Sequence, residues 1–180
     1  MPVLFKMKLV LIAAMLISPT TAWLQTSLAR QLTVNDGLSQ NYIYAIAQDH
    51  NDFVWFGTKD GLNRFDGYQF KVFKHATNDS TTISDNEVIA LHNDRKGRLW
   101  VGTSVGLNLY NPDTESFYRF DDVKQKAEIK GTHINAITED KSGNIWVHYG
   151  ANLRQWNRKL KLLKTTTKPV SYTHLTLPTN

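Results

Sequence analysis

One pattern of about 45 residues occurs three times in this chain, and it limits the possible folds more than any other feature. When Trp55, Trp100 and Trp146 are placed in one column, the copies are separated by 45 and 46 residues. Other columns hold Ala ten residues before the Trp, Leu seven residues after it and an aromatic residue ten residues after it. An Asp stands six residues before each Trp, at Asp49, Asp94 and Asp140. So many columns agree without a gap that the chain is a repeat protein.

Each copy is predicted to form four short strands separated by turns. In the second copy the strands are expected in "EVIALHN", "RLWVGTS", "VGLNLYN" and "SFYRF", with turns at "DRKG" and "PDTE". The apolar period of 3.6 residues that marks helical repeats is absent. Four strands in about 45 residues are typical of a β-propeller blade. We therefore expect an all-β fold, an incomplete β-propeller of about three four-stranded antiparallel blades, at residues 40–76, 83–122 and 131–166.

The repeated residues have structural explanations. The aligned Asp is expected to accept turn amides, and the Trp to fill the wedge between neighbouring blades. Gly57 and Gly102, two residues after the Trp, are expected to open the second hairpin. Alternatively, the aspartates are acid/base groups or calcium ligands, and the tryptophans are platforms for carbohydrate stacking. A catalytic carboxylate is normally unique in a fold, so we interpret these repeated positions as structural.

The first copy also carries a resemblance to a known family. Residues 35–73, "NDGLSQNYIYAIAQDHNDFVWFGTKDGLNRFDGYQFKVF", resemble a repeat of the two-component regulator propeller family, and the second copy is similar. The third copy departs, because His148 and Tyr149 replace the Gly-Thr pair and Asn152 replaces a later Gly. Either this blade is locally distorted, which we favour, or His148 has a functional role.

The resemblance covers roughly residues 30–165 and implies a function. Such repeats form the periplasmic sensor region of membrane-anchored hybrid two-component histidine kinases or diguanylate cyclases. The implied chain is an N-terminal fragment of such a receptor, exported and attached to the inner membrane through a helix further along. The implied partners are a small-molecule or oligosaccharide ligand and a second copy of the receptor in a homodimer. No cofactor, metal or catalytic residue is expected in this segment.

Both ends of the chain are predicted to lie outside the blades. Residues 1–22, or 1–29 with the later cleavage position, have lysines, an apolar run at 9–17 and then small residues, which is typical of a signal peptide. A buried core helix is the alternative. Residues 30–39 are expected to hold an outer strand, at Leu32 to Val34, and the linker of a neighbouring or closing blade. Residues 170–180 fit no repeat column and are interpreted as a non-native tail, with a native linker strand as the alternative.

Charge and cysteine content exclude other classes of function. Removal of residues 1–22 takes away two lysines and lowers the formal net charge from +5 to +3, and the remaining basic residues are scattered except for "RKLKLLK" at 158–164. A nucleic-acid-binding protein would need a basic face with stacking aromatics. The chain has no cysteine, which excludes disulfides and thiolate metal sites.

Propeller ligands usually lie over the central channel, where the loops enter the inner strands. The candidate ligand-binding residues are therefore the polar residues that flank each expected inner strand, namely Asn41, Tyr42, Asn86, Glu87, Thr132 and His133. A purely structural role in capping the blades is the alternative for each. For the whole protein, an exported propeller enzyme acting on polysaccharide and a secreted protein-binding scaffold are the alternatives to a sensor.

Overall fold

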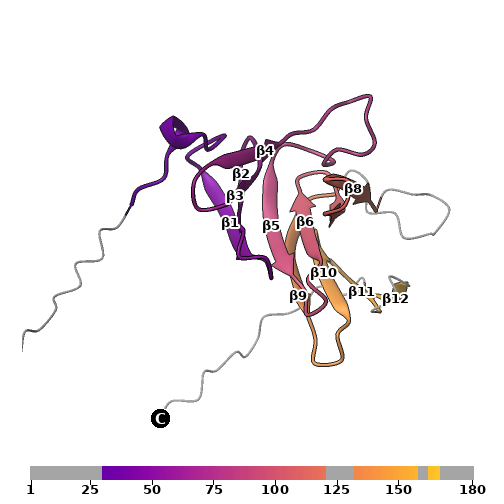
Figure 1. Cartoon of the computed structure of the whole chain (residues 1–180). Coiled ribbons are helices and arrows are strands. Elements are labelled where there is room, and N and C mark those ends of the chain that lie inside the picture. The colour runs from indigo at the N-terminus through magenta and orange to yellow at the C-terminus, as the bar shows by residue number, and fades with distance from the viewer. Residues whose placement is uncertain (1–29, 121–131, 158–161, 167–180) are drawn as a thin grey trace, which may run out of the picture. The chain divides into compact units, whose positions relative to one another are not determined.

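The computed structural model describes residues 30–120, 132–157 and 162–166 (Figure 1). The chain divides into two units, Met1–Gln31 and Leu32–Asn180, and the strands described below all belong to the second. The predicted signal peptide and the predicted tail at 170–180 lie outside the described residues. Within the described ranges, no helix is long and apolar enough to cross a membrane.

Three four-stranded antiparallel sheets follow one another along the chain (Figure 1). In each sheet, strands that are consecutive in sequence are neighbours, so each sheet is one blade. Blade 1 contains β1 (Ile43–Gln48), β2 (Val54–Thr58), β3 (Gly61–Phe65) and β4 (Phe70–Phe73). Blade 2 contains β5 (Val88–Asn93), β6 (Leu99–Thr103), β7 (Leu107–Asn111) and β8 (Ser116–Arg119). Blade 3 contains β9 (Ile134–Glu139), β10 (Ile145–Tyr149), β11 (Asn152–Trp156) and β12 (Leu162–Thr166). The predicted all-β fold of four-stranded blades is confirmed.

The first strand of each blade packs against the first strand of the next. Strand β5 contacts both β1 and β9, and we call these three the inner strands (Figure 1). Each inner strand has a register shift near its start, which leaves one extra residue there, at Tyr44, Ile89 and Asn135. A bulge of this kind bends the strand and redirects a side chain. Blade 3 keeps the pairing of its first three strands and the bulge, so no distortion is observed at His148 itself. The pairing of β11 with β12, however, has a register shift between Gln155 and Trp156 that the corresponding pairs of blades 1 and 2 lack.

Two of the repeated tryptophans, Trp55 and Trp100, fill the spaces between blades, whereas Trp146 in blade 3 is half-buried. Trp55 is fully buried and contacts the rings of Phe73 in its own blade and Tyr110 in blade 2, at centroid distances of 5.7 and 4.8 Å. Trp100 is fully buried in a second cluster that extends from blade 2 to Trp156 in blade 3. Burial of such large apolar surfaces is the main attraction between neighbouring blades.

Gly57 and Gly102 do not open the hairpin as predicted, because both lie inside strands. A Cβ atom on Gly57 would lie 2.7 Å from the carbonyl oxygen of Val88, the first residue of the next inner strand. A Cβ atom on Gly102 would lie 2.5 Å from a methyl carbon of Ile134, at the same place one blade further on. These glycines therefore allow the next inner strand to approach the preceding blade closely.

A polar network ties the segment before each of the first two inner strands to its own blade. In blade 1 the Ser39 amide donates to the Asn63 side chain at 2.8 Å, and the Ser39 and Thr58 hydroxyls are 3.0 Å apart. Blade 2 repeats these contacts with Ser84, Asn108 and Thr103, at 2.9 and 2.7 Å. The Asn and Thr side chains of the network are buried in both blades. They form hydrogen bonds with the Ser and with backbone carbonyls of their own blade, so their polar atoms have partners.

The outer strand expected at Leu32 to Val34 is not present. In its place stands a single turn of 3₁₀ helix, η1 (Val34–Asp36), whose N-cap residue Thr33 forms a capping box with Asp36. The turn ends at Gly37, which has φ +102°, and Leu38 is then buried. An outer strand needs a neighbouring strand to pair with, whereas a capped turn satisfies its amides locally.

Candidate functional site

The aligned aspartates connect the first turn of each blade to the repeated Trp. One oxygen of Asp49 accepts the backbone amides of Asn51 and Phe53, at 2.9 and 3.1 Å. The other oxygen accepts the indole N–H of Trp55 at 2.7 Å. The same indole bond is 2.9 Å long in blade 2, from Trp100 to Asp94, and in blade 3, from Trp146 to Asp140.

Hydrogen bonding favours the ionised form of the Asp94 and Asp140 carboxylates. Burial of Asp94 opposes ionisation, but the bonds from Trp100 and from Arg98 outweigh it and lower the pKa of the carboxyl. The indole N–H of Trp146 and the amides of Asn144 also lower the pKa of Asp140. Both oxygens of each aligned Asp accept hydrogen bonds from the same blade, which agrees with a structural role. Sequence reasoning did not anticipate the bond to the indole, although the constant spacing of six residues was a signal for it.

The predicted ligand-binding residues lie where the chain enters the inner strands, and two of them, Asn41 and Asn86, accept backbone amides from preceding segments. The side-chain oxygen of Asn41 accepts the Val34 amide at 3.1 Å, and that of Asn86 accepts the His75 amide at 2.7 Å. Of the last pair, His133 is exposed and Thr132 is half-buried just before β9. No hydrogen bond joins any two of the six predicted side chains directly among the described contacts.

An unpredicted residue, Tyr44, joins blades 1 and 2 at this end. The bulge residue Tyr44 donates its hydroxyl to the Glu87 carboxylate at 2.6 Å, and its ring meets the edge of Tyr42 at 4.8 Å. Tyr42 and Tyr44 are 61% and 38% exposed. The hydrogen bond to Glu87 raises the pKa of Tyr44 to about 12, so its phenol is protonated at neutral pH. The column that holds Tyr44 holds Ile and Asn in the other blades, so no repeated residue marks it in the sequence.

The two tyrosines and Glu87 form what we call the tyrosine site. Exposed aromatic rings offer apolar faces, and a carboxylate accepts hydrogen bonds from hydroxyl groups. Close to Glu87, the Asp85 carboxylate accepts the Ser104 hydroxyl at 2.8 Å. The tyrosine site therefore has the groups required to hold a small polar ligand that has an apolar face.

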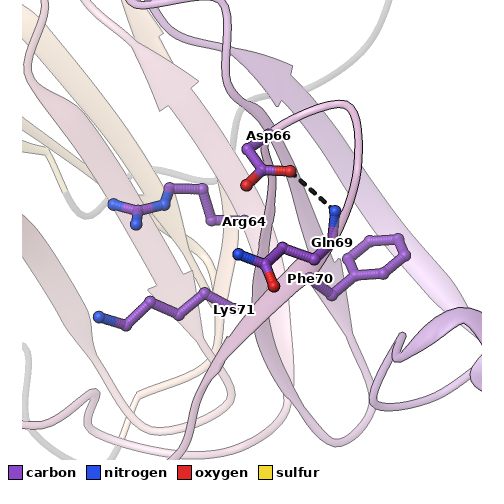
Figure 2. A pocket seen from close by; sticks show the side chains of 5 residues that line it. All are labelled: Arg64, Asp66, Gln69, Phe70 and Lys71. Carbon is purple, nitrogen blue, oxygen red and sulfur yellow. Dashed lines mark hydrogen bonds between the residues drawn. The ribbon is translucent and has the colours of Figure 1, made fainter.

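A separate cavity of about 280 Å³ lies on the outer half of blade 1 (Figure 2). It is lined by Arg64, Asp66, Gln69, Phe70 and Lys71. Arg64 and Lys71 are directly opposite each other on β3 and β4. Figure 2 shows their side chains extending in the same direction with Gln69 between them, whereas the Phe70 ring points the other way. Sequence reasoning named none of these residues.

The cavity is charged, and a carboxylate from blade 2 reaches its cations. Asp66 accepts the backbone amides of Tyr68 and Gln69, both at 2.8 Å, and these bonds lower its pKa. Glu115, in the turn after β7, accepts from Arg64 at 3.0 Å and forms a second ion pair with Lys71. These two pairs connect the outer strands of blade 1 to the turn between β7 and β8 of blade 2.

Comparison with known proteins agrees with the repeat pattern. Residues 37–60, 82–105 and 128–149 match the family model described as two component regulator propeller. A stretch of 55 residues is 47% identical to Histidine kinase P4 from Formosa agariphila, and it makes up 31% of this chain and 4% of the kinase.

Solved structures with the same fold are also known. The extracellular domain of BT3049 from B. thetaiotaomicron, assigned to a hybrid two component system, is similar with a TM-score of 0.66 and 29% identity. The similarity covers 76% of this chain and 19% of that domain. Virginiamycin B lyase from Staphylococcus aureus shares the fold, with a TM-score of 0.51 and 14% identity over 71% of this chain and 42% of the lyase.

The family match coincides with the structural repeat. Each matched segment contains the inner strand and the second strand of one blade, together with the Asp and Trp that are joined by a hydrogen bond. The chain spans only 4% of the kinase and 19% of the extracellular domain to which it is similar. Each of the three blades therefore contains a segment that matches the two component regulator propeller repeat.

Proposed function

We propose that this chain is a segment of the periplasmic ligand-sensing propeller of a membrane-anchored two-component receptor. The observation that carries the proposal is the match of all three blades to the two component regulator propeller family. The similarity to an extracellular domain assigned to a hybrid two component system and to a histidine kinase supports it. The proposal includes attachment to the inner membrane, a homodimeric receptor and a kinase output, all of which depend on parts of the protein beyond this segment.

The ligand proposed for the tyrosine site is an oligosaccharide. Sugar rings present apolar C–H faces that stack on aromatic side chains, and their hydroxyls donate to carboxylates such as Glu87. The Tyr44–Glu87 bond joins the inner strand of blade 1 to the residue just before the inner strand of blade 2, so a ligand that competes for Glu87 would change the contact between these blades. Signalling would then follow from a shift in population between two arrangements of the blades.

Titration of the chain with a panel of oligosaccharides tests this proposal, with intrinsic fluorescence as the readout. Tyr42→Ala and Tyr44→Ala are expected to weaken binding of the best ligand at least about tenfold, the loss expected when a stacking aromatic is removed. Tyr68→Ala is the matched control, because Tyr68 is an exposed tyrosine of the β3–β4 turn. Unchanged affinity in both inner-strand variants would rule out the tyrosine site. Shortened sugar products in the same samples would instead favour a propeller enzyme, and the absence of any sugar binding would favour a scaffold.

A further inference from the structure

We propose that Arg64 and Lys71 form a binding site for a small hydroxylated carboxylate, and that Glu115 pairs with these two cations as an internal competitor. The site consists of the cavity of Figure 2, on the outer strands of blade 1, and of the position of the Glu115 carboxylate, which contacts both cations but does not line the cavity. It shares no residue with the tyrosine site, so the inference stands apart from the proposed function.

The Arg64 guanidinium is held in position by contacts other than Glu115. Its central carbon lies 4.6 Å from the centre of the Phe53 ring, and it donates to the Tyr110 hydroxyl at 3.1 Å. The side chain is only 19% exposed. Because these contacts do not involve a carboxylate, the guanidinium would keep its orientation if Glu115 left, and a preorganised cation binds an anion at lower entropic cost.

Glu115 has the properties of a ligand that can be displaced. It has φ +50°, in the left-handed region that residues with a Cβ atom rarely adopt, so its backbone is strained. Its side chain is 38% exposed and its partner Lys71 is 47% exposed. Ion pairs that are this open to water contribute little to stability. A carboxylate from solution can therefore replace Glu115 on the two cations at small cost, and the turn after β7 is then free to relax.

The other polar residues of the cavity, Asp66 and Gln69, favour a ligand that has hydroxyl groups. Asp66 uses one oxygen for two backbone amides, and a carboxylate has further acceptor sites. The Gln69 amide, which lies between Arg64 and Lys71 in Figure 2, both donates and accepts. A volume of about 280 Å³ is at the small end for ligand cavities, which suits a single sugar acid. The carboxylate would bind to the cations, and the hydroxyls to Asp66 and Gln69.

Isothermal titration of the whole chain with D-glucuronate at low ionic strength tests the inference. Glu115→Gln is expected to bind D-glucuronate at least about fivefold more tightly than the unmodified chain, because the competing charge is gone. Glu115→Gly, which also removes the backbone strain, is expected to bind at least as tightly as Glu115→Gln. Lys71→Met is expected to bind at least about fivefold more weakly than the unmodified chain, because half of the cation pair is lost. Far-UV circular dichroism confirms that each variant is folded.

Two further ligands distinguish the contribution of the carboxylate to binding from that of the hydroxyl groups. D-glucose tests the hydroxyls without the carboxylate, and acetate tests the carboxylate without the hydroxyls. Both are expected to bind more weakly than D-glucuronate to every variant. Equal affinity for acetate and D-glucuronate would overturn the role of Asp66 and Gln69. Folded Glu115 variants that bind D-glucuronate no better than the unmodified chain would overturn the site itself, whatever the outcome for the tyrosine site.

Discussion

Replacement of Asp94 by Asn measures how much the turn carboxylate contributes to the stability of a blade. Asp94 is 4% exposed, and its Oδ1 accepts the amides of Lys96 and Arg98 at 2.9 and 3.0 Å. Its Oδ2 accepts the Trp100 indole N–H at 2.9 Å and forms an ion pair with Arg98. Asn has the same shape and keeps the first oxygen, but it places an NH₂ group where the Trp100 indole and the Arg98 guanidinium now donate.

The expected loss follows from those contacts. A hydrogen bond to a charged group contributes about 1.5–3 kcal/mol, and Asn removes two of them. Arg98 is partly exposed, so in the variant its guanidinium can form hydrogen bonds with water in place of some of those to Asp94. We therefore expect Asp94→Asn to lower the free energy of unfolding by about 2–4 kcal/mol at pH 7. Asp113→Asn, an exposed aspartate in the turn after β7, is the matched control and is expected to change it by less than about 0.5 kcal/mol.

The pH dependence of the free energy of unfolding provides a second, independent test. The pKa of Asp94 is lowered in the folded protein, so the folded state binds fewer protons than the unfolded state in the acid range. Its contribution is complete above the unfolded pKa, which is about 3.9, and is lost as the pH falls through the folded pKa. The difference between the unmodified chain and Asp94→Asn should therefore be constant near pH 7 and become smaller below about pH 4.

Urea unfolding, followed by far-UV circular dichroism, measures these free energies, and a double-mutant cycle with Trp100→Phe isolates the indole bond. Phe keeps an aromatic ring but has no N–H. The effect of Asp94→Asn is expected to be smaller by about 1–2 kcal/mol when residue 100 is Phe. A coupling energy near zero, or an Asp94→Asn variant as stable as the unmodified chain, would refute this account of the turn.

Three further changes test other parts of the fold, the first two by the same unfolding assay and the third by amide hydrogen exchange. Gly102→Ala places a Cβ atom 2.5 Å from Ile134 and is expected to cost about 1–3 kcal/mol; a neutral result would contradict the close approach of the blades. Asp52 has φ +64° where Gly143 stands in blade 3, so Asp52→Gly is expected to stabilise the chain by about 0.5–1 kcal/mol, and destabilisation would show that the strain estimate is wrong. Arg119 donates to three backbone carbonyls of the loop between β4 and β5, so Arg119→Met is expected to speed amide hydrogen exchange there, and unchanged exchange would exclude this role.

The features that were predictable from the sequence are those that every blade must share. A Trp that fills the space between blades, and an Asp that closes a turn, recur because each blade has the same packing problem. Columns of identical residues therefore gave the strands and the register of the blades. The role of Gly57 was not predictable in the same way, because it depends on the approach of Val88 from a different blade.

The charged cavity was missed for a related reason. The position equivalent to Arg64 is Leu109 in blade 2 and Gln155 in blade 3, so no column marks it. Its partner Glu115 lies 51 residues away in the sequence, and nothing local connects the two. Only the stacking of consecutive blades brings them together. Tyr44 was missed in the same way, since its contact with Glu87 spans 43 residues.

The third blade shows how a departure from the repeat changes the physical basis of a contact. Where the first two blades have Thr and Asn in a buried polar network, blade 3 has Tyr149 and Arg154. The Arg154 guanidinium lies 5.1 Å from the centre of the Tyr149 ring, which is buried in the core between blades 2 and 3. At the two positions that carry the buried Thr and Asn in blades 1 and 2, blade 3 therefore has a cation–π contact between its own second and third strands.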